Sequence, residues 1–369
     1  MPKQKITIPE GWRKENLGDI AVIKNGKTNT QDAVVDGEYP LFDRSVAIKR
    51  SNKFLFDAEA VILPGEGAEF VPRYFKGKFD LHQRAYAILP NEKNVASKYL
   101  YYFLCKFNNI LLKNAVGSTV KSLRLPIIQK MSVLLPSLAE QQKISEILCA
   151  VDEDIEKTEK IIEQTEKLKK GLMQELFTKG IGHIKFKKTK LGEVPSEWEI
   201  KDFITVATLQ RGYDLPANKR IGGIYPLASS NGITDSHNEF KVEGPGVFTG
   251  RSGTLGNIFY IEKNYWPLNT TLYVKDFHGN NGKFIYYFLQ MMNLREMGTG
   301  TGVPTLNRNI VHSKKIAVPK FIDEQKQIAD ILSGVDDQID IYKKLKLKLT
   351  ELKKGLMQDL LSGITRVNI

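Results

Sequence analysis

Basic, amide and hydroxyl side chains gather in two short runs at matching places along the chain. The first run is Leu81-His-Gln-Arg84 and the second is Leu268-Asn-Thr-Thr271. The leucine and a following tyrosine, Tyr86 or Tyr273, repeat, whereas the polar residues between them differ. In the major groove of DNA, arginine pairs with guanine, and asparagine or glutamine pairs with adenine. A fixed frame with changed polar residues is what two readers of different base sequences need; ordinary drift between duplicated segments is the alternative.

Other candidates for DNA contact carry basic or hydrogen-bonding side chains in the same two regions, since phosphate contacts come from any such group near a groove. In the first region the candidates are Arg44, Arg73, Lys76, Lys78, His82, Gln83, Arg84, Lys121 and Arg124. In the second region they are Arg211, Tyr213, Lys219, Arg220, Ser229, Asn231, Arg251, Ser252, Asn269, Thr270, Asn307 and Arg308.

Motifs for catalysis are missing from the sequence. It contains no G-x-x-x-x-G-K-[ST] loop, no H-E-x-x-H, no G-x-S-x-G and no Asn/Asp-Pro-Pro-Tyr/Phe tetrapeptide of adenine methyltransferases. The nearest approaches to a cofactor loop, Gly65-Glu66-Gly67 and Gly250-Arg251-Ser252-Gly253, stand 185 residues apart and so favour a turn repeated in the fold. His82 is opposed by Asn269, which argues against a shared catalytic role. We expect no active site and no bound cofactor.

The two cysteines, Cys105 and Cys149, lie 44 residues apart with no histidine cluster near them. This spacing argues against both a disulfide framework and a structural zinc site, so we expect no metal. The amino terminus leads into no apolar stretch of a signal peptide, and no apolar run reaches the length of a membrane span. A cytoplasmic location is therefore the expectation.

Charge points to the class of partner. The chain has 369 residues with 54 Lys and Arg against 42 Asp and Glu, a net charge of +12. Hydrophobic residues make up 41% and charged residues 26%, which excludes global disorder and a fibrous repeat. The length predicts two or three compact units, and the excess of basic residues predicts a polyanionic partner.

The chain is a tandem repeat. Glu140 to Leu176 matches Glu324 to Leu360 without a gap at an offset of 184, and Leu-Lys-Lys-Gly-Leu-Met-Gln is identical at 168–174 and 352–358. The preceding segments repeat more loosely, with Pro9-x-x-Trp12 answered by Pro195-x-x-Trp198. We therefore divide the chain into two variable parts, 1–139 and 183–322, and two constant parts, 140–182 and 323–369.

The constant parts are predicted to be long helices, because apolar residues recur at alternating steps of four and three and no proline interrupts them. Two such stretches favour a paired, antiparallel coiled-coil spacer over ordinary surface helices. Gly171 and Gly355 occupy the same point of each helix; close packing of another backbone, or a bend, and a fraying end are both open readings. The first apolar stripe is Ile144, Leu148, Val151, Ile155, Thr158, Ile162 and Thr165. The second is Ile328, Leu332, Val335, Ile339, Tyr342, Leu349, Leu352, Leu356 and Leu360.

The variable parts are predicted to be α+β domains in a pseudo-two-fold tandem repeat. Short helices with aromatic faces are expected at 98–106 and 283–292. Strand-like runs, most of them bounded by Gly, Pro, Asn or Asp, lie at 60–63, 85–89, 246–249, 258–261 and 271–274.

The excess of positive over negative charge is confined to the variable parts. Residues 1–139 carry 21 basic and 13 acidic side chains, and residues 183–322 carry 18 and 11. The constant parts carry 7 and 10 at 140–182, and 8 and 8 at 323–369. A basic surface kept for solubility would show no such partition, so the variable parts are predicted to bind double-stranded DNA at two separate half-sites held apart by the helices.

The order of variable and constant parts resembles the specificity (S) subunit of type I restriction-modification systems over essentially the whole chain. The marks are Pro9-Glu-Gly-Trp12 with Leu17-Gly-Asp19, Leu191-Gly-Glu-Val-Pro-Ser-Glu-Trp198, Leu135-Pro136 ahead of Glu140-Gln141, Val318-Pro319 ahead of Glu324-Gln325, and the two helix ends. None is specific alone; their duplication in this order carries the resemblance.

The resemblance implies a non-catalytic subunit in which each variable part is a target recognition domain for one half of a split, asymmetric DNA sequence. It also implies that the helices bind methyltransferase subunits, two in number, which carry S-adenosylmethionine, and that a translocating nuclease subunit joins for cleavage. A related two-component system, in which one partner fuses methylation and cleavage, stays open. So do a DNA-bridging protein with no enzyme partner and a genuine enzyme.

Overall fold

The computed structural model describes residues 8–91, 93–118, 120–300 and 304–369. They form two compact units: Met1–Glu159 together with Lys344–Ile369, and Lys160–Lys343. We call these the first and the second unit. Helices α5 (Leu138–Lys179) and α8 (Ile322–Leu360) are each divided between them, so each unit contains one variable part, half of its own long helix and half of the other. No helix in the described part of the chain is long and apolar enough to cross a membrane.

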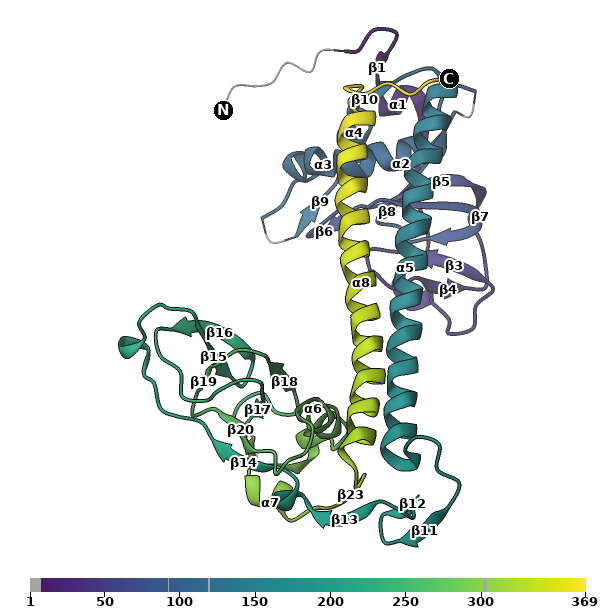
Figure 1. Cartoon of the computed structure of the whole chain (residues 1–369). Coiled ribbons are helices and arrows are strands. Elements are labelled where there is room, and N and C mark those ends of the chain that lie inside the picture. The colour runs from purple at the N-terminus through teal and green to yellow at the C-terminus, as the bar shows by residue number, and fades with distance from the viewer. Residues whose placement is uncertain (1–7, 92, 119, 301–303) are drawn as a thin grey trace. The chain divides into compact units, whose positions relative to one another are not determined.

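The first unit is built on a six-stranded sheet of order β2-β8-β5-β7-β3-β4 (Figure 1). All pairs are antiparallel except β3 with β7. The strands of the whole first unit are β1 (Arg13–Asn16), β2 (Ala21–Asn25), β3 (Tyr39–Phe42), β4 (Lys49–Ser51), β5 (Phe56–Pro64), β6 (Glu66–Gly67), β7 (Arg73–Leu81), β8 (Ala85–Pro90), β9 (Lys121–Ser122) and β10 (Ser132–Leu135). Its short helices are α1 (Leu17–Ile20), η1 (Thr30–Asp32), α2 (Ser97–Lys106), α3 (Asn108–Asn114) and α4 (Leu125–Gln129).

The second unit repeats this topology with one strand interrupted. Its sheets have the orders β14-β20-β17-β18 and β16-β15-β19, so β18 and β19 together take the place of the continuous β7. Its strands are β11 (Phe186–Thr189), β12 (Gly192–Pro195), β13 (Glu199–Asp202), β14 (Thr208–Arg211), β15 (Tyr225–Ser229), β16 (Gly232–His237), β17 (Gly246–Gly250), β18 (Ile258–Ile261), β19 (Trp266–Pro267), β20 (Thr271–Asp276), β21 (Gly298–Thr299), β22 (Thr305–Leu306) and β23 (Lys315–Val318). Its short helices are η2 (Phe203–Thr205), η3 (Ala217–Lys219), α6 (Gly282–Met291), η4 (Leu294–Met297) and α7 (Arg308–His312).

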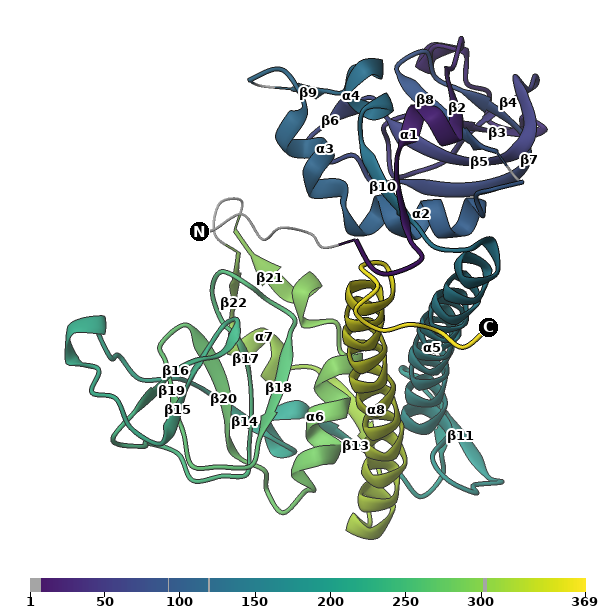
Figure 2. The ribbon, with the colours of Figure 1, turned by 90° about the horizontal axis from the view of Figure 1, so that it is seen from above.

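The prediction of mixed α and β structure is confirmed. The helices expected at 98–106 and 283–292 are α2 and α6, and all five strand-like runs lie in strands. In the second unit, α6 lies between the sheet and α8, and α2 takes the corresponding place in the first unit (Figures 1 and 2).

The largest hydrophobic core of each unit joins its variable part to both long helices. In the first unit, Phe103 of α2 is buried in one cluster with Leu148 of α5 and Leu360 of α8. In the second unit, Phe288 of α6 is buried with Phe177 of α5 and Leu332 of α8. The long helices are divided between the units for this reason: the end of each helix completes the core of the other repeat.

Ion pairs join the two long helices within each unit. In the first unit, Lys353 Nζ lies 2.5 Å from Asp152 Oδ1, and Lys346 pairs with Glu159 at 2.6 Å. In the second, Lys169 pairs with Asp336 at 2.7 Å and Lys343 with Glu166 at 2.8 Å. Residue numbers rise along one helix as they fall along the other, so the helix segments of each unit run in opposite directions.

The predicted apolar stripes lie away from solvent with one exception. No member of the first stripe is exposed, but Leu352 of the second stripe is 51% exposed. This part of the prediction is wrong because Lys353 takes the inward place, where its ammonium pairs with Asp152 and lies 5.6 Å above the ring of Tyr102. A charge partner on the facing helix therefore decides which residue points inward.

The repeated Glu-Gln dipeptide at the start of each long helix fixes that helix to the rest of its unit. The Glu140 carboxylate accepts two hydrogen bonds from Arg366, at 2.6 and 2.8 Å. Glu324 accepts hydrogen bonds from the Trp198 indole at 3.2 Å and the Ile181 amide at 3.1 Å. Each glutamate thus holds residues that follow the end of the other long helix.

Gln141 and Gln325 hold the variable parts. Gln141 Oε1 accepts from the Ala96 amide that begins α2, and Gln325 Oε1 accepts from the Asn281 amide that begins α6, at 2.9 and 3.0 Å. Their amide groups donate to backbone oxygens, including those of Pro136 and Pro319. The repeated proline ahead of Glu-Gln in the sequence therefore corresponds to the same hydrogen-bonded joint in both units.

The second unit is expected to lose stability in mild acid. His312 Nε2 accepts a hydrogen bond from the Leu209 amide at 2.9 Å, so the buried ring is neutral. Burial, with Arg308 nearby, lowers the pKa of His312 below its ordinary value. The unfolded chain then binds more protons, so the contribution of His312 is complete above about pH 6.5 and falls below it.

Amide hydrogen exchange of β14 at pH 7.5 and 5.5 measures this loss directly. His312→Gln keeps an acceptor for the Leu209 amide but cannot be protonated in this range, so its β14 protection is expected to change less with pH. Equal pH dependence in the variant and the parent chain would contradict the assignment.

Candidate nucleic-acid interface

The same network of backbone hydrogen bonds builds a turn in each unit, directly before β8 and β20. The Ala85 amide donates to His82 O, and the Thr271 amide donates to Leu268 O, both at 2.9 Å. The residue after β5, Gly65, donates to Arg84 O at 2.8 Å, and Arg251 donates to Thr270 O at 2.7 Å. The two turns are therefore equivalent, bond by bond.

Glycine is required where β2 and β14 approach these turns. A side chain at Gly26 would place its Cβ 1.9 Å from Leu81 O, and one at Gly212 would place it 2.2 Å from Leu268 O. Both distances are far below van der Waals contact, so only glycine fits. The strand exits and the turns are thereby held at fixed distances, whatever polar side chains they carry.

This network corrects the alignment predicted from the sequence. His82 is equivalent to Leu268, not to Asn269, and Gly65 is equivalent to Arg251 rather than to Gly250. Identical leucine and tyrosine letters suggested a register that is one residue off, but strand pairing places Tyr86 opposite Asn25 and Leu272 opposite Arg211. The argument that histidine is not shared still holds, since leucine cannot act as an acid or base.

In the first unit the turn forms one side of a polar hollow of about 290 Å³. We call its lining the first rim: Asn29, Thr30, Gln31, Asp43, Arg44, Glu66, His82, Gln83 and Arg84. Four predicted residues, Arg44, His82, Gln83 and Arg84, are brought together there. Arg84 pairs with Glu66 at 2.9 Å and remains 63% exposed, so its charge is available to a ligand.

Loop contacts hold the first rim in shape. Arg73 donates to Ser45 O at 2.5 Å and to Val46 O at 2.9 Å, which fixes the loop that carries Arg44. Burial by itself raises the pKa of Asp43, but hydrogen bonds from Lys49 and Ser45 bring it below its ordinary value, so the carboxylate is charged. Burial also lowers the pKa of His82, against the pull of Asp43.

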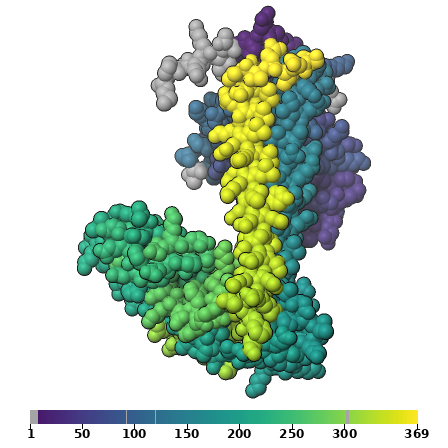
Figure 3. Space-filling model, in the orientation of Figure 1, coloured from purple at the N-terminus to yellow at the C-terminus, as the bar shows by residue number. Residues whose placement is uncertain are grey.

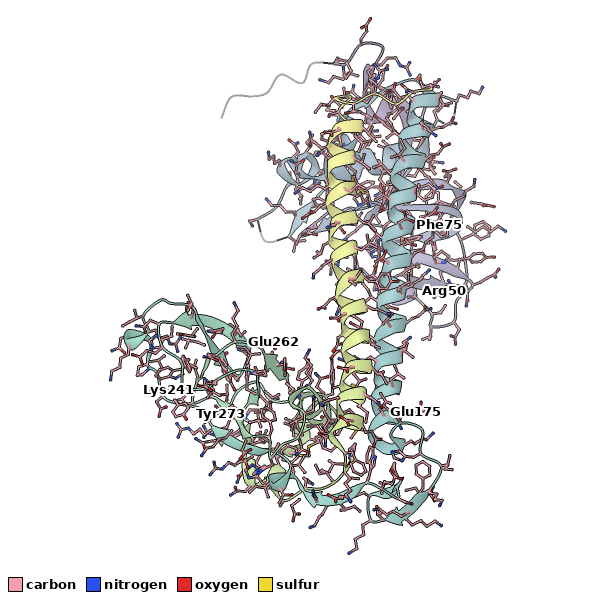
Figure 4. The ribbon with its side chains drawn as sticks, viewed as in Figure 1. Arg50, Phe75, Glu175, Lys241, Glu262 and Tyr273 are labelled. Atoms are coloured by element: carbon pink, nitrogen blue, oxygen red, sulfur yellow. The ribbon has the colours of Figure 1, made fainter. Side chains whose placement is uncertain are left out.

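In the second unit the equivalent polar surface carries different side chains. We call this surface the second rim; it consists of Arg211, Tyr213, Asp214, Ser229, Arg251, Ser252, Asn269 and Thr270. Arg251 Nη1 donates to Asn269 O at 3.0 Å, and Arg211 Nη2 lies 3.3 Å from Asp214 Oδ1. The phenol oxygen of Tyr213 lies 3.1 Å from that of Tyr273, a residue of β20 that Figure 4 labels.

Comparison with known proteins identifies the family. The profile of the type I restriction modification DNA specificity domain matches residues 9–167 and 195–351, one copy in each half of the chain. The chain belongs to this family. The predicted resemblance is therefore confirmed.

Relatives and solved structures agree with the family over the full chain. The chain is 28% identical over 416 residues to the putative type I restriction enzyme MjaX specificity subunit of Methanocaldococcus jannaschii, covering 98% of this chain and 95% of that protein. The MjaVIII specificity subunit of the same organism is 25% identical over 423 residues, with the same coverage. The crystal structure of a type I S subunit from M. genitalium matches the fold with a TM-score of 0.70, at 20% identity, over 100% and 99% of the two chains.

Other predicted contact residues of this family member lie outside the two rims. Lys76 pairs with Glu59 at 3.7 Å, and Lys78 lies 4.7 Å above the Phe54 ring. Lys121 and Arg124 are exposed, and β9, which carries Lys121, pairs with β6 beside Glu66 of the first rim. Arg50, which was not a candidate, donates to the carbonyls of Gly37 and Glu38 at the sheet edge (Figure 4).

In the second unit, Asn307 and Arg220 have local hydrogen-bonding partners. Asn307 Oδ1 accepts from the Asn309 amide at 3.0 Å and so caps α7. Arg220 donates to Leu215 O at 3.4 Å, while Lys219 and Arg308 are exposed. Asn231 is exposed and its amide donates to Ser229 Oγ at 3.2 Å.

Sequence reasoning missed six rim residues, Asn29, Thr30, Gln31, Asp43, Glu66 and Asp214, and two of them hold side-chain amides in place. Asn29 accepts a hydrogen bond from the Gln83 side chain at 2.6 Å, and Asp214 accepts one from the Asn269 side chain. Asn29 lies three residues after Gly26, and Asp214 lies two residues after Gly212, so the two stand 185 residues apart. A search for polar residues just after these strand-end glycines could have found both. No cluster of metal-ligating side chains occurs among the residues that the structure describes.

Proposed function

We propose that the chain is the DNA-reading subunit of a type I restriction-modification complex, and that each rim binds one half of a split, asymmetric double-stranded DNA sequence. The observation that carries this proposal is the pair of turns with one backbone network and different polar side chains. A constant frame presents the reading groups at a fixed place, and the changed side chains give each half its own sequence.

The net charge of each part of the chain supports a separate role for it. Residues 1–139 and 183–322 act as target recognition domains, and 140–182 and 323–369 act as spacer helices. We propose that the helices form an antiparallel coiled coil that relates the two repeats by a pseudo-two-fold axis, since equivalent Lys-Asp pairs occur in both units. Such a spacer would set the distance between the half-sites.

A repeated exposed stripe supports the docking of partner subunits. Leu345 and Leu352 of α8 are 41% and 51% exposed, and Ile161 and Leu168, at the same offset of 184 on α5, are 36% and 55% exposed. Gly355 and Gly171 follow three residues later on the same helix face, and a Cβ there would meet nothing within 4 Å. Figure 3 shows the C-terminal half of α8 uncovered on one face.

Two copies of one stripe fit two copies of one partner. We assign them to two methyltransferase subunits, which would carry S-adenosylmethionine and perform the chemistry, so that this chain binds no cofactor and catalyses no reaction itself. A restriction subunit with translocase and nuclease activity would join this assembly through them. Since its DNA target lies there, the complex would act in the cytoplasm.

The rim assignment is tested with Arg84→Ala and Arg211→Ala. Methylome sequencing of a host carrying the system first gives the two half-sites, and duplexes with one half-site scrambled are then titrated with the complex. Each variant is expected to weaken recognition of one half-site roughly tenfold, since a lost arginine contact to a base costs about 1–3 kcal/mol, and to leave the other half-site unchanged.

The outcomes separate the alternatives. Equal loss on all sequences with a shallower salt dependence would assign these arginines to phosphate. Unchanged binding by both variants would remove the rims from the interface. DNA binding without any methylation when the neighbouring methyltransferase is supplied would favour a DNA-bridging protein, and methylation by the purified chain alone would make it an enzyme.

A further inference from the structure

A side-chain amide occupies the same backbone position in both rims. Gln83 and Asn269 each follow the residue whose carbonyl closes the turn, His82 or Leu268, and each precedes the residue that accepts from Gly65 or Arg251. The predicted alignment hid this match because it placed Asn269 opposite His82. At most other positions of the two rims the polar side chains differ in type, so the shared amide stands out.

Each amide is held by one polar neighbour on the segment that follows the strand-end glycine. Gln83 Nε2 donates to Asn29 Oδ1 at 2.6 Å, and Asn269 Nδ2 donates to Asp214 Oδ1. Because a carboxylate only accepts, Asp214 fixes which end of the Asn269 amide faces it. Arg211 supports that carboxylate from 3.3 Å.

Each amide keeps one unused donor and one unused acceptor, and we call this pair its recognition fork. One N–H is used by the neighbour, which leaves the second N–H and the side-chain oxygen. Neither Gln83 Oε1 nor Asn269 Oδ1 has a hydrogen-bond partner among the described residues. Gln83 is exposed and Asn269 is half-buried, so neither side chain is enclosed by the fold. An amide serving only the fold would instead be enclosed and satisfied on both sides, as Gln141 is.

We propose that Gln83 and Asn269 are the adenine-reading residues of the two half-sites. An amide oxygen accepts from adenine N6, and an amide N–H donates to adenine N7, in one bidentate contact in the major groove. Asn29 and Asp214 are positioning residues that set the fork before DNA arrives, which lowers the ordering cost of binding. This inference rests on the proposed function and deepens it: both half-sites contain an A·T pair at the place that the turn reads.

The experiment uses the chain in complex with its methyltransferase subunits and a library of duplexes in which every half-site position is varied singly. Gln83→Ala is expected to reduce the preference for adenine at one position of one half-site roughly 10- to 100-fold. Asn269→Ala is expected to do the same in the other half-site. Gln83→Glu is expected to move the preference at that position to cytosine, because a carboxylate accepts from cytosine N4.

The outcomes are distinct from those of the arginine variants. If Arg84→Ala weakens binding while Gln83→Ala and Asn269→Ala leave every base preference intact, or lower affinity evenly at all positions, this inference is overturned and the proposed function stands. If none of these variants changes DNA binding, the rims are not the DNA interface, and the proposed assignment of one half-site to each rim is itself wrong. Thermal unfolding of each variant checks folding, which is expected to be unchanged at the exposed Gln83.

Discussion

On the proposed docking of two methyltransferase subunits, Gly355→Trp is expected to release one of them, and Gly171→Trp combined with Gly355→Trp to release both. Each glycine lies on a long helix with open space around its Cα, next to an exposed leucine three residues earlier, Leu168 or Leu352. A partner helix that packs on this stripe would meet the indole in place of bare backbone. Mass measurement of the assembled complex counts the subunits directly.

Alanine at the same two positions is the matched control. The isolated chain is expected to become more stable by about 1 kcal/mol for each Gly→Ala change, because glycine is a poor helix former and nothing in the chain occupies the space. That open space excludes close packing of another part of this chain as the reason for the two glycines. Fraying of the helix ends is excluded too, because α5 continues beyond Gly171 to Lys179 and α8 continues beyond Gly355 to Leu360. Full assembly of the double tryptophan variant would remove the stripe from the docking surface.

Gln141→Ala is expected to destabilise the first unit by about 3 kcal/mol, and Gln325→Ala the second unit by a similar amount. The Gln141 side chain makes three hydrogen bonds to backbone groups, at 2.9, 3.1 and 3.0 Å, and is fully buried. Removing it leaves those buried groups unsatisfied, at a cost of about 1 kcal/mol or more each. Denaturant unfolding followed by hydrogen exchange of α2 and α6 assigns each loss to its unit.

Exposed glutamines beside these positions provide controls. Gln142→Ala and Gln327→Ala change the same residue type on the same helices without a buried partner, so they are expected to alter stability by less than about 0.5 kcal/mol. Loss of protection in α2 for Gln325→Ala, or in α6 for Gln141→Ala, would contradict a joint that is local to each unit.

The long helices and the strands could be read from the sequence because their signals are local. Alternation of apolar residues in steps of four and three fixes a helix face without reference to the rest of the chain, and α5 and α8 begin and end within three residues of the repeated Glu-Gln and Gly landmarks. Leu352 shows where this reasoning ends. Its spacing fits the stripe as well as its neighbours do, but the charge on Asp152, far away in sequence, draws Lys353 inward instead.

The rim residues are a second case in which contacts between distant segments could not be predicted from the sequence. Arg44, His82, Gln83 and Arg84 come together because the parallel strands β3 and β7 finish at the same end of the sheet, where the His82 amide donates to Phe42 O. The one-residue error in the predicted alignment has a related cause. The matching leucine and tyrosine letters recur at an offset of 187, whereas the hydrogen bonds that build the two turns recur at an offset of 186, and letters alone cannot show this difference.

The sequence by itself determined the duplication, the long helices, the placement of positive charge on the variable parts and the family. These features are written in periodicity, composition and repeated letters, which need no knowledge of contacts. Only the tertiary structure decided which half of each helix completes which core, and that Gln83 and Asn269 stand at one equivalent position. Both depend on hydrogen bonds and packing between segments far apart in the chain, and such contacts are set by the folded backbone rather than by neighbours in sequence.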